Sequence, residues 1–257
     1  MNVGARLGQA RQALSRDPIK RYEGRYSVVS GVVRRLGFRL YNTNLKWIDD
    51  PAYIGAWEQF PMTRDEVKDR KFALWSFALA TANLPGDTAE CGVFDGGSSF
   101  LMCVSREREP GWAGEHHLFD SYEGLSEPES LDMPHDNRSF RWRKHDLSVP
   151  ERVVLENLRR FPFVRSHPGW IPDRFDEVAD REFSFVHVDV DLFAPTRDAI
   201  EFFYPRMVPG GVLLCDDYGF TTCPGATKAF DEFISSRPER SVVHLPTGQG
   251  FIVKRGD

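Results

Sequence analysis

The sequence predicts an α/β fold whose sheet is mostly parallel. From residue 61 onward, short apolar runs typical of strands alternate with longer segments that have helical spacing. Several of the runs are apolar on both faces, as strands covered by helices on both sides must be. The 257 residues suit one domain with additional elements. We therefore expect a doubly wound, Rossmann-like domain at residues 61–257, preceded by an N-terminal helical extension at residues 1–60.

The elements of this domain can be placed in order along the chain. A Thr63–Glu66 capping box predicts a helix that runs to about residue 83. Its buried face should carry Phe72, Trp75, Leu79 and Ala82. Five strands are expected, with helices between them, within residues 88–93, 116–120, 161–170, 182–191 and 210–219. Residues 241–246 and 249–256 should then pair as an antiparallel hairpin at or near the edge of the sheet.

The bulk composition restricts the compartment of the protein. No apolar run approaches the roughly 18 residues that a transmembrane helix needs. The beginning of the chain lacks the pattern of a secretory signal peptide. The cysteines have no CxxC spacing and lie mostly in apolar stretches, which is typical of reduced thiols. We therefore expect a cytoplasmic protein without stable membrane insertion.

Charge is distributed unevenly along the chain. The net charge is −5, but residues 1–48 hold ten Lys/Arg and two Asp/Glu, a balance of +8 that leaves −13 for the rest. An acidic body argues against nucleic acid as a partner. Several roles fit the basic segment. It could be a solvated helical face, a packing arm or a targeting peptide. It could also form a lid over an anionic substrate, or contact acidic lipid or a second copy in a homo-oligomer.

The end of the first strand and the end of the second indicate a nucleoside-type cofactor. In an open α/β sheet, ligands bind outside the carboxyl ends of the strands. Gly92, Gly96 and Gly97 allow a tight turn and a close backbone approach, with Ser98 at the start of the next helix. The spacing is neither GxGxxG nor a P-loop, and a plain tight turn also explains it. Asp120 is placed to accept hydrogen bonds from ribose hydroxyls or to cap a helix; together with the glycines it indicates an adenosine-type cofactor.

Four carboxylates follow the fourth and fifth strands, at Asp189, Asp191, Asp216 and Asp217. Four carboxylates this close would repel one another unless a cation binds between them. Mg²⁺, which prefers oxygen ligands, is the simplest candidate for that cation. Capping of the two following helices explains one or two of the acids, but not easily all four. The "DVD" stretch alone also fits a metal-dependent glycosyltransferase. The neighbouring His187 is expected to be a core strand residue and not a ligand.

Five segments then point to one family. In order they are "AECGVFDGGSS", "LFDSYEGL", "HPGWIPDRF", "FVHVDVDLFAPT" and "GGVLLCDDYG". Over roughly residues 60–255 they resemble the macrocin O-methyltransferase (TylF) family of metal-dependent S-adenosylmethionine enzymes. The resemblance implies a class I methyltransferase sheet, S-adenosylmethionine and Mg²⁺ or a similar ion as cofactors, and methylation of a sugar hydroxyl on a glycosylated natural product or glycan, as in antibiotic biosynthesis. Asp95 departs from the family, in which a basic residue is expected at this position.

The resemblance also implies roles for single residues. Asp189, Asp216 and Asp217 become metal ligands, and Asp191 becomes the general base. The residues implied to line the cofactor are Glu90, Gly92, Gly96, Ser98 and Asp120, with Trp170 packing near the adenine. A core or interface position explains Trp170 equally well. The alternatives to this function are the glycosyltransferase, a catechol-type O-methyltransferase and a catalytically silent scaffold.

Overall fold

The structure is a computed structural model that describes residues 11–40, 42, 44–61, 67–135, 140–235, 237 and 241–256. The chain divides into two compact units, Met1–Glu58 and Gln59–Asp257. Within the described ranges, no helix combines the length and the apolar character needed to cross a membrane.

The first unit is helical, with α2 (Pro18–Arg35), α3 (Lys46–Asp49) and α4 (Pro51–Trp57). Asp17 caps α2, because its side chain accepts hydrogen bonds from the backbone N–H groups of Ile19 and Lys20. Pro18 occupies the first turn, where its missing N–H has no consequence. Asp50 caps α4 in the same way. An Asp-Pro pair therefore begins both α2 and α4 in this helical N-terminal segment.

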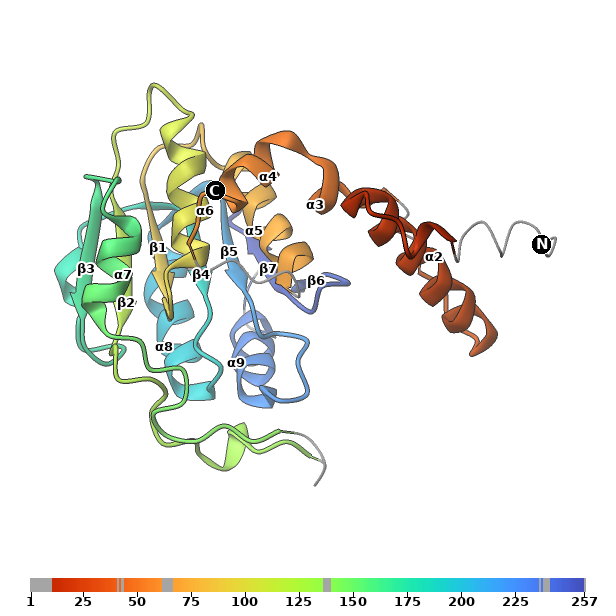
Figure 1. Cartoon of the computed structure of the whole chain (residues 1–257). Helices are drawn as coiled ribbons and strands as arrows, with labels where there is room; N and C mark the ends of the chain where they lie inside the picture. The colour runs from red at the N-terminus through yellow and green to blue at the C-terminus, as the bar shows by residue number, and fades with distance from the viewer. Residues whose placement is uncertain are drawn as a thin grey trace. The chain divides into compact units, whose positions relative to one another are not determined.

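The second unit contains a seven-stranded sheet with the order β3-β2-β1-β4-β5-β7-β6 (Figure 1). Strands β1 to β5 pair in parallel, whereas β7 pairs antiparallel with both β5 and β6. This confirms the mostly parallel sheet with a C-terminal antiparallel hairpin. The strands are β1 (Asp87–Cys91), β2 (His116–Asp120), β3 (Val164–Pro168), β4 (Phe183–Val188), β5 (Met207–Cys215), β6 (Val243–His244) and β7 (Gly250–Val253).

One helix precedes β1, and the others alternate with the strands as the doubly wound topology requires. They are α5 (Lys68–Ala80), α6 (Gly97–Glu107), α7 (Glu151–Leu158), α8 (Phe193–Phe203) and α9 (Pro224–Ser235), with the 3₁₀ turns η2 (Ser130–Asp132), η3 (Phe175–Val178) and η4 (Tyr204–Arg206). From β1 the chain winds outward through β2 to β3, and from β4 it winds the other way to β5. Because such crossovers are right-handed, α6 and α7 cover one face of the sheet and α8 the other.

The strand order reverses between β1 and β4, and ligands bind at such a switch point. The register brings three strand ends level there. Cys91 pairs with Val188, and Val188 pairs with Cys215. The residues that follow these three positions therefore leave the sheet side by side, and they include the glycine turn and all four aspartates.

The prediction for the first helix of the domain was partly wrong. The Thr63–Glu66 capping box lies outside the described residues, and α5 begins at Lys68. Its buried residues are Leu74, Trp75 and Ala78, while Leu79 is 38% exposed. In this orientation Arg70 and Lys71, one turn before Leu74 and Trp75, contact the aspartates described next.

Candidate active site

The four aspartates lie in the turns just beyond the strands. The backbone N–H of Asp189 donates to the carbonyl oxygen of Cys91 at 2.8 Å, and that of Asp216 donates to Val188 at 2.9 Å. These bonds extend the sheet by one residue before each chain turns. Side-chain oxygen atoms of Asp189, Asp216 and Asp217 all lie within 4.8 Å of one another. The fold therefore assembles the three residues that the sequence offered as metal ligands.

Asp191 occupies an unusual backbone conformation beside this cluster. Its φ is +58°, in the left-handed region that aspartate tolerates better than most residues. The backbone N–H of Asp191 donates to Oδ2 of Asp217 at 3.1 Å. Ligand atoms of Asp191, Asp217 and Cys223 form a second close group. The turn thus delivers the carboxyl group of Asp191 to the same end of the sheet as the other acids.

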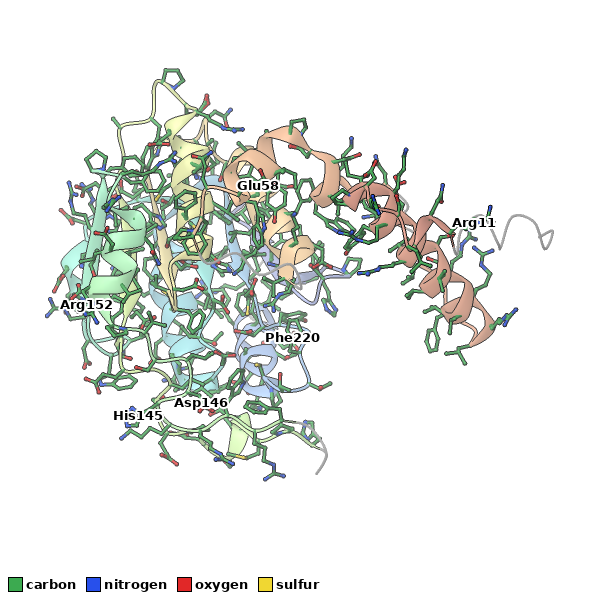
Figure 2. All side chains as sticks on the ribbon, in the orientation of Figure 1. Arg11, Glu58, His145, Asp146, Arg152 and Phe220 are labelled. Carbon is green, nitrogen blue, oxygen red and sulfur yellow. The ribbon has the colours of Figure 1, made fainter. Side chains whose placement is uncertain are left out.

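Two cations that the sequence interpretation missed also enter the cluster. Arg70 donates through Nη2 to Oδ2 of Asp216 and, at 3.3 Å, to the carbonyl oxygen of the same residue. Lys71 places Nζ 3.8 Å from Oδ2 of Asp189 and donates to the hydroxyl of Ser98. The guanidinium of Arg70 also lies over the ring of Phe220, 4.5 Å from its centroid (Phe220 is labelled in Figure 2). Part of the negative charge is therefore balanced by the chain itself.

The acids titrate differently because their surroundings differ. Burial and the charge of Asp189 raise the pKa of Asp191 to about 7. Burial and the other three aspartates raise the pKa of Asp217 well above its usual range. Burial also acts on Asp216, but Lys71, His187 and Arg70 together hold the pKa of that carboxyl far below its usual range. The cluster therefore keeps one firmly ionised carboxylate and others that favour a cation or a proton.

A buried chain of ion pairs and hydrogen bonds leads away from Asp216. His187 is fully buried, with Nε2 3.3 Å from Oδ1 of Asp216 and Nδ1 2.8 Å from Oε1 of Glu90. Burial lowers the pKa of His187, but its contacts with the two acids prevail and raise it to about 9. The hydroxyl of Ser99 donates to the other oxygen of Glu90. His187 is thus a core residue, as expected, and both oxygens of Glu90 have protein partners behind the glycine turn.

The glycine turn needs its glycines for steric reasons. At Gly92 φ is +80°, and a Cβ there would lie 1.8 Å from the carbonyl oxygen of Asp189. Gly96, with φ +87°, is the N-cap of α6. Asp95 accepts a hydrogen bond from the backbone N–H of Gly97 at 3.0 Å. The departure from the family at Asp95 therefore has a local explanation, since this carboxylate satisfies the backbone N–H of the first residue of α6.

Asp120 ties the second strand to the glycine turn. Its Oδ2 accepts from the backbone N–H of Val93 at 2.7 Å, and its Oδ1 accepts from that of Tyr122 at 2.6 Å. Trp170 is half-buried and follows Gly169, whose N–H donates to the carbonyl oxygen of Asp120 at 3.0 Å. Asp120 and the chain at Trp170 thus meet at one strand end, and the cofactor roles of Glu90, Gly92, Gly96, Ser98, Asp120 and Trp170 stay predictions.

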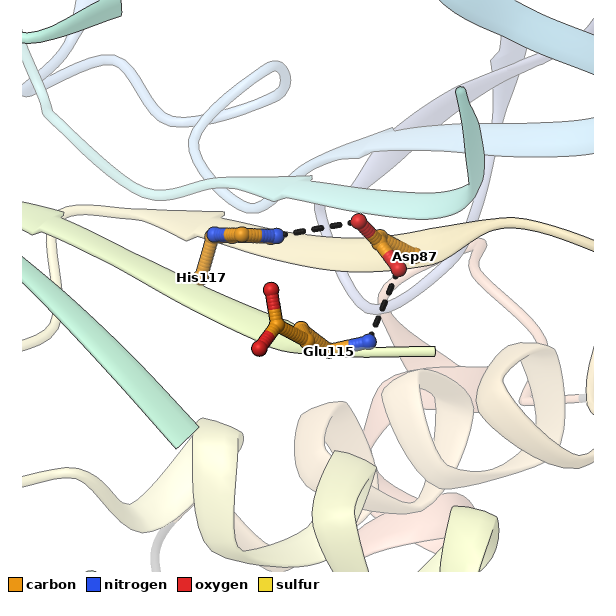
Figure 3. A group of neighbouring side chains, drawn as sticks. All are labelled: Asp87, Glu115 and His117. Atoms are coloured by element: carbon orange, nitrogen blue, oxygen red, sulfur yellow. Dashed lines mark hydrogen bonds and ion pairs between the residues drawn. The ribbon is translucent and has the colours of Figure 1, made fainter. Parts of the chain in front are cut away.

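Another group with metal-ligand spacing lies near the amino ends of the strands, and Figure 3 shows it. It comprises Asp87, Glu115 and His117, beside a cavity of about 370 Å³. Arg181 donates to Asp87 at 2.7 Å and to Glu115 at 2.5 Å, and Arg165 pairs with Glu115 at 2.7 Å. Because guanidinium groups already neutralise both acids, we assign this group a structural role.

With this geometry in hand, comparison with known proteins identifies the family. The macrocin-O-methyltransferase (TylF) family matches residues 73–239. The chain belongs to this family. Membership confirms the resemblance drawn from the five segments and decides against the glycosyltransferase alternative for the "DVD" stretch.

Two relatives are O-methyltransferases by name. An 8-demethyl-8-(2,3-dimethoxy-alpha-L-rhamnosyl)-tetracenomycin-C 4'-O-methyltransferase from Streptomyces olivaceus is 34% identical over 149 residues, or 56% of this chain and 57% of the relative. A demethyldecarbamoylnovobiocin O-methyltransferase from Streptomyces niveus is 29% identical over 156 residues, 59% of each chain. The similarity therefore spans less than two thirds of these relatives.

Solved structures show the same fold at lower identity. The calicheamicin methyltransferase CalS11 superposes with a TM-score of 0.63 and 14% identity, over 95% of each chain. The O-methyltransferase TomG from Streptomyces achromogenes, solved in complex with SAM, gives a TM-score of 0.51 and 13% identity over 88% of this chain and 97% of TomG. The sheet and helices are thus those of class I O-methyltransferases, as predicted.

Proposed function

We propose that this protein is an S-adenosylmethionine-dependent O-methyltransferase that uses Mg²⁺ or a similar divalent ion and methylates a sugar hydroxyl of a glycosylated natural product. Family membership and the two named relatives support the reaction and the substrate class. The observation that carries the mechanism is the convergence of Asp189, Asp216 and Asp217 within 4.8 Å, with Asp191 bonded to one of them.

The cofactor would lie against the glycine turn. Gly92 and Gly96 keep side chains out of the turn, and the N-terminus of α6 follows at Gly97. Asp120 stands at the next strand end, where an acid suits ribose hydroxyls. S-adenosylmethionine supplies a sulfonium methyl group that is strongly electrophilic. The complex of TomG with SAM, on the same fold, supports this cofactor.

The donor set at the aspartates fits a hard divalent ion. Three carboxylates within reach of one another offer the oxygen ligands that Mg²⁺ prefers. Asp189, Asp216 and Asp217 would hold the ion, and the ion would lower the pKa of a sugar hydroxyl and fix its position. Arg70 and Lys71 already balance part of the negative charge of the aspartates. The proposal of a bound ion therefore rests on the three oxygen ligands, and not only on the repulsion between the carboxylates.

The chain's own residues would then complete the transfer. Asp191 takes the proton from the acceptor hydroxyl while the oxygen attacks the methyl carbon. The new C–O bond would form as the S–CH₃ bond breaks, with S-adenosylhomocysteine as the leaving group. A carboxyl pKa near 7 suits a base that must accept a proton near neutrality. Alignment of oxygen, methyl and sulfur supplies the remaining acceleration.

Transfer of label from methyl-tritiated S-adenosylmethionine tests this function. The acceptor panel should include glycosylated antibiotics whose sugars have a free hydroxyl, together with a catechol. We expect labelled sugar product with Mg²⁺ and at least about a hundredfold loss after chelation. Full activity after thorough chelation removes the metal from the proposal, and label on the catechol alone replaces the acceptor class.

Asp191→Asn tests the base separately. The variant should bind S-adenosylhomocysteine and Mg²⁺ with wild-type affinity in calorimetry but lose turnover, because an amide cannot take the proton. Turnover near the wild-type rate would remove the base assignment and leave the methyltransferase function intact.

Two broader expectations also belong to the proposal. The basic N-terminal segment would mediate a homo-oligomer, and the protein would act in the cytoplasm. Light scattering of the full chain, with and without residues 1–48, tests the first. A monomer in both samples contradicts it.

A further inference from the structure

We propose that Cys223 is a positioning residue for Asp191: its thiol holds one oxygen of the carboxyl group, and Trp142 fixes the direction of that thiol. The inference rests on the proposed role of Asp191 as the base and adds two residues to that site.

The thiol of Cys223 lies within hydrogen-bonding distance of the base. Its Sγ is 3.4 Å from Oδ1 of Asp191, and the residue is 2% exposed. Cys223 directly precedes α9, and its carbonyl oxygen accepts the backbone N–H of Ala226 at 3.1 Å. The sulfur is therefore carried by the start of a helix that packs in the main core cluster, and its position is set by the fold.

The direction of the hydrogen bonds follows from the inventory of donors. Trp142 Nε1 lies 3.3 Å from Sγ, and an indole nitrogen only donates, so the sulfur accepts there. The single S–H proton is then left to point toward Asp191. The hydroxyl of Thr222, 3.6 Å from the sulfur, can donate to it as well. Burial raises the pKa of the Cys223 thiol far above its ordinary value, which keeps the S–H donor in place.

The consequence is an aspartate held at two points. Asp217 accepts the backbone N–H of Asp191, and Cys223 donates to Oδ1. Among the described residues no hydrogen bond reaches Oδ2. One oxygen is thus fixed by protein and the other is left for an acceptor hydroxyl. Fixing a reacting group in one orientation accelerates a step without changing how tightly the substrates bind.

Trp142 belongs to the long segment between β2 and α7, whose residues His145 and Asp146 are labelled in Figure 2. Its ring packs against the main core cluster and, edge to face, against Phe140 at 5.0 Å. The same segment is tied down again at η2, where Asp132 accepts the backbone N–H of Phe193 at 2.7 Å. The thiol that orients the base is therefore itself oriented by a segment distant in sequence.

Substitutions at Cys223 test the proposal through steady-state kinetics. Cys223→Ala should lower kcat about five- to tenfold, the worth of one hydrogen bond, while KM for both substrates stays within about twofold. Cys223→Ser should restore most of kcat, because a hydroxyl also donates. Trp142→Phe keeps an aromatic ring, though a smaller one, and loses the N–H, so kcat should fall with KM again unchanged.

Cys103→Ala provides the matched control. Cys103 is also free and fully buried, but it lies on α6 and has no contact with the aspartates among the described residues. Its truncation should lower the melting temperature about as much as Cys223→Ala and leave kcat unchanged.

These variants distinguish the positioning role of Cys223 from the role of Asp191 as the base. Wild-type kcat in Cys223→Ala, or equal losses in the Ala and Ser variants, overturns the positioning role while an inactive Asp191→Asn keeps the base. An active Asp191→Asn removes both assignments. If Cys223→Ala does not fold, the Ser and Trp142→Phe variants decide: normal kcat in Trp142→Phe and loss in Cys223→Ser would contradict the proposal.

Discussion

The backbone N–H of Asp191 donates to the carboxylate of Asp217 at 3.1 Å, so one acid holds the turn that presents another. Asp217 also belongs to the group of Asp189 and Asp216 that could hold an ion. On the proposed function, its carboxylate would have two separable roles: a charge for the cation, and an acceptor for the backbone N–H of a residue in the left-handed region.

Two substitutions of Asp217 should separate these functions. Asp217→Asn keeps an oxygen that accepts from Asp191 but loses the charge, so Mg²⁺ affinity in calorimetry should fall about tenfold or more while saturating Mg²⁺ recovers turnover. Asp217→Ala also loses the acceptor, and saturating Mg²⁺ should then leave kcat low. Equal recovery in both variants would show that the hydrogen bond to Asp191 is dispensable.

Gly92→Ala should be strongly destabilising. The new Cβ would meet the carbonyl oxygen of Asp189 at 1.8 Å, in a backbone conformation that costs a non-glycine residue about 1–2 kcal/mol before any clash. We expect a loss of about 3 kcal/mol or more in urea unfolding. Gly111→Ala is the control, because a Cβ there has no neighbour within 4 Å among the described residues. Similar stabilities for the two variants would contradict the close approach of β1 and β4.

The sheet and the acids could be predicted because their signals are local. Apolar runs on both faces mark buried parallel strands, and residues that follow such runs collect at one edge whatever the details of register. The predicted strand at residues 116–120 coincides with β2, and the fourth strand ends at Val188, just before Asp189. Asp189, Asp216 and Asp217 therefore came together in the structure as the sequence indicated.

Arg70 and Lys71 could not be found in this way, because their signal is tertiary. Helical spacing alone fits several stripes on α5, and the chosen stripe placed Leu79 on the buried face. The structure has a different rotation, in which the cations contact the aspartates and lie four residues before the buried Leu74 and Trp75. The hydrogen bond from Cys223 to Asp191 was equally out of reach, since it joins residues 32 positions apart.

Arg70→Met should expose how much the carboxylates depend on that cation. Removing one partner of a buried ion pair costs about 3–5 kcal/mol, and the 23% exposure of the Arg70 side chain places the expected loss nearer about 2 kcal/mol. Added Mg²⁺ should restore part of it. Arg197→Met, which breaks the exposed pair with Asp198, should cost under about 1 kcal/mol. Equal small losses in urea unfolding would mean that Asp216 does not need Arg70.

His116 should make the domain sensitive to acid. Its ring is fully buried, with Nδ1 2.7 Å from the hydroxyl of Thr88 and Nε2 2.8 Å from that of Ser99. Ser99 gives its only proton to Glu90, so Nε2 must donate to Ser99 and Nδ1 accepts from Thr88. The neutral ring is fully satisfied, and burial lowers the pKa of His116 to about 3.

The sign of the effect follows from proton counting. Between the ordinary pKa of about 6.5 and the folded value of about 3, the unfolded chain binds one proton more, so stability falls as pH falls, by up to about 1.4 kcal/mol per pH unit. Between about pH 6.5 and about pH 5 the free energy of unfolding in urea should therefore fall by about 2 kcal/mol more in the wild type than in His116→Gln, which cannot take the proton. The same change at the exposed His135 is the control for the substitution itself. Parallel curves for wild type and His116→Gln would mean that the buried ring accepts a proton without cost.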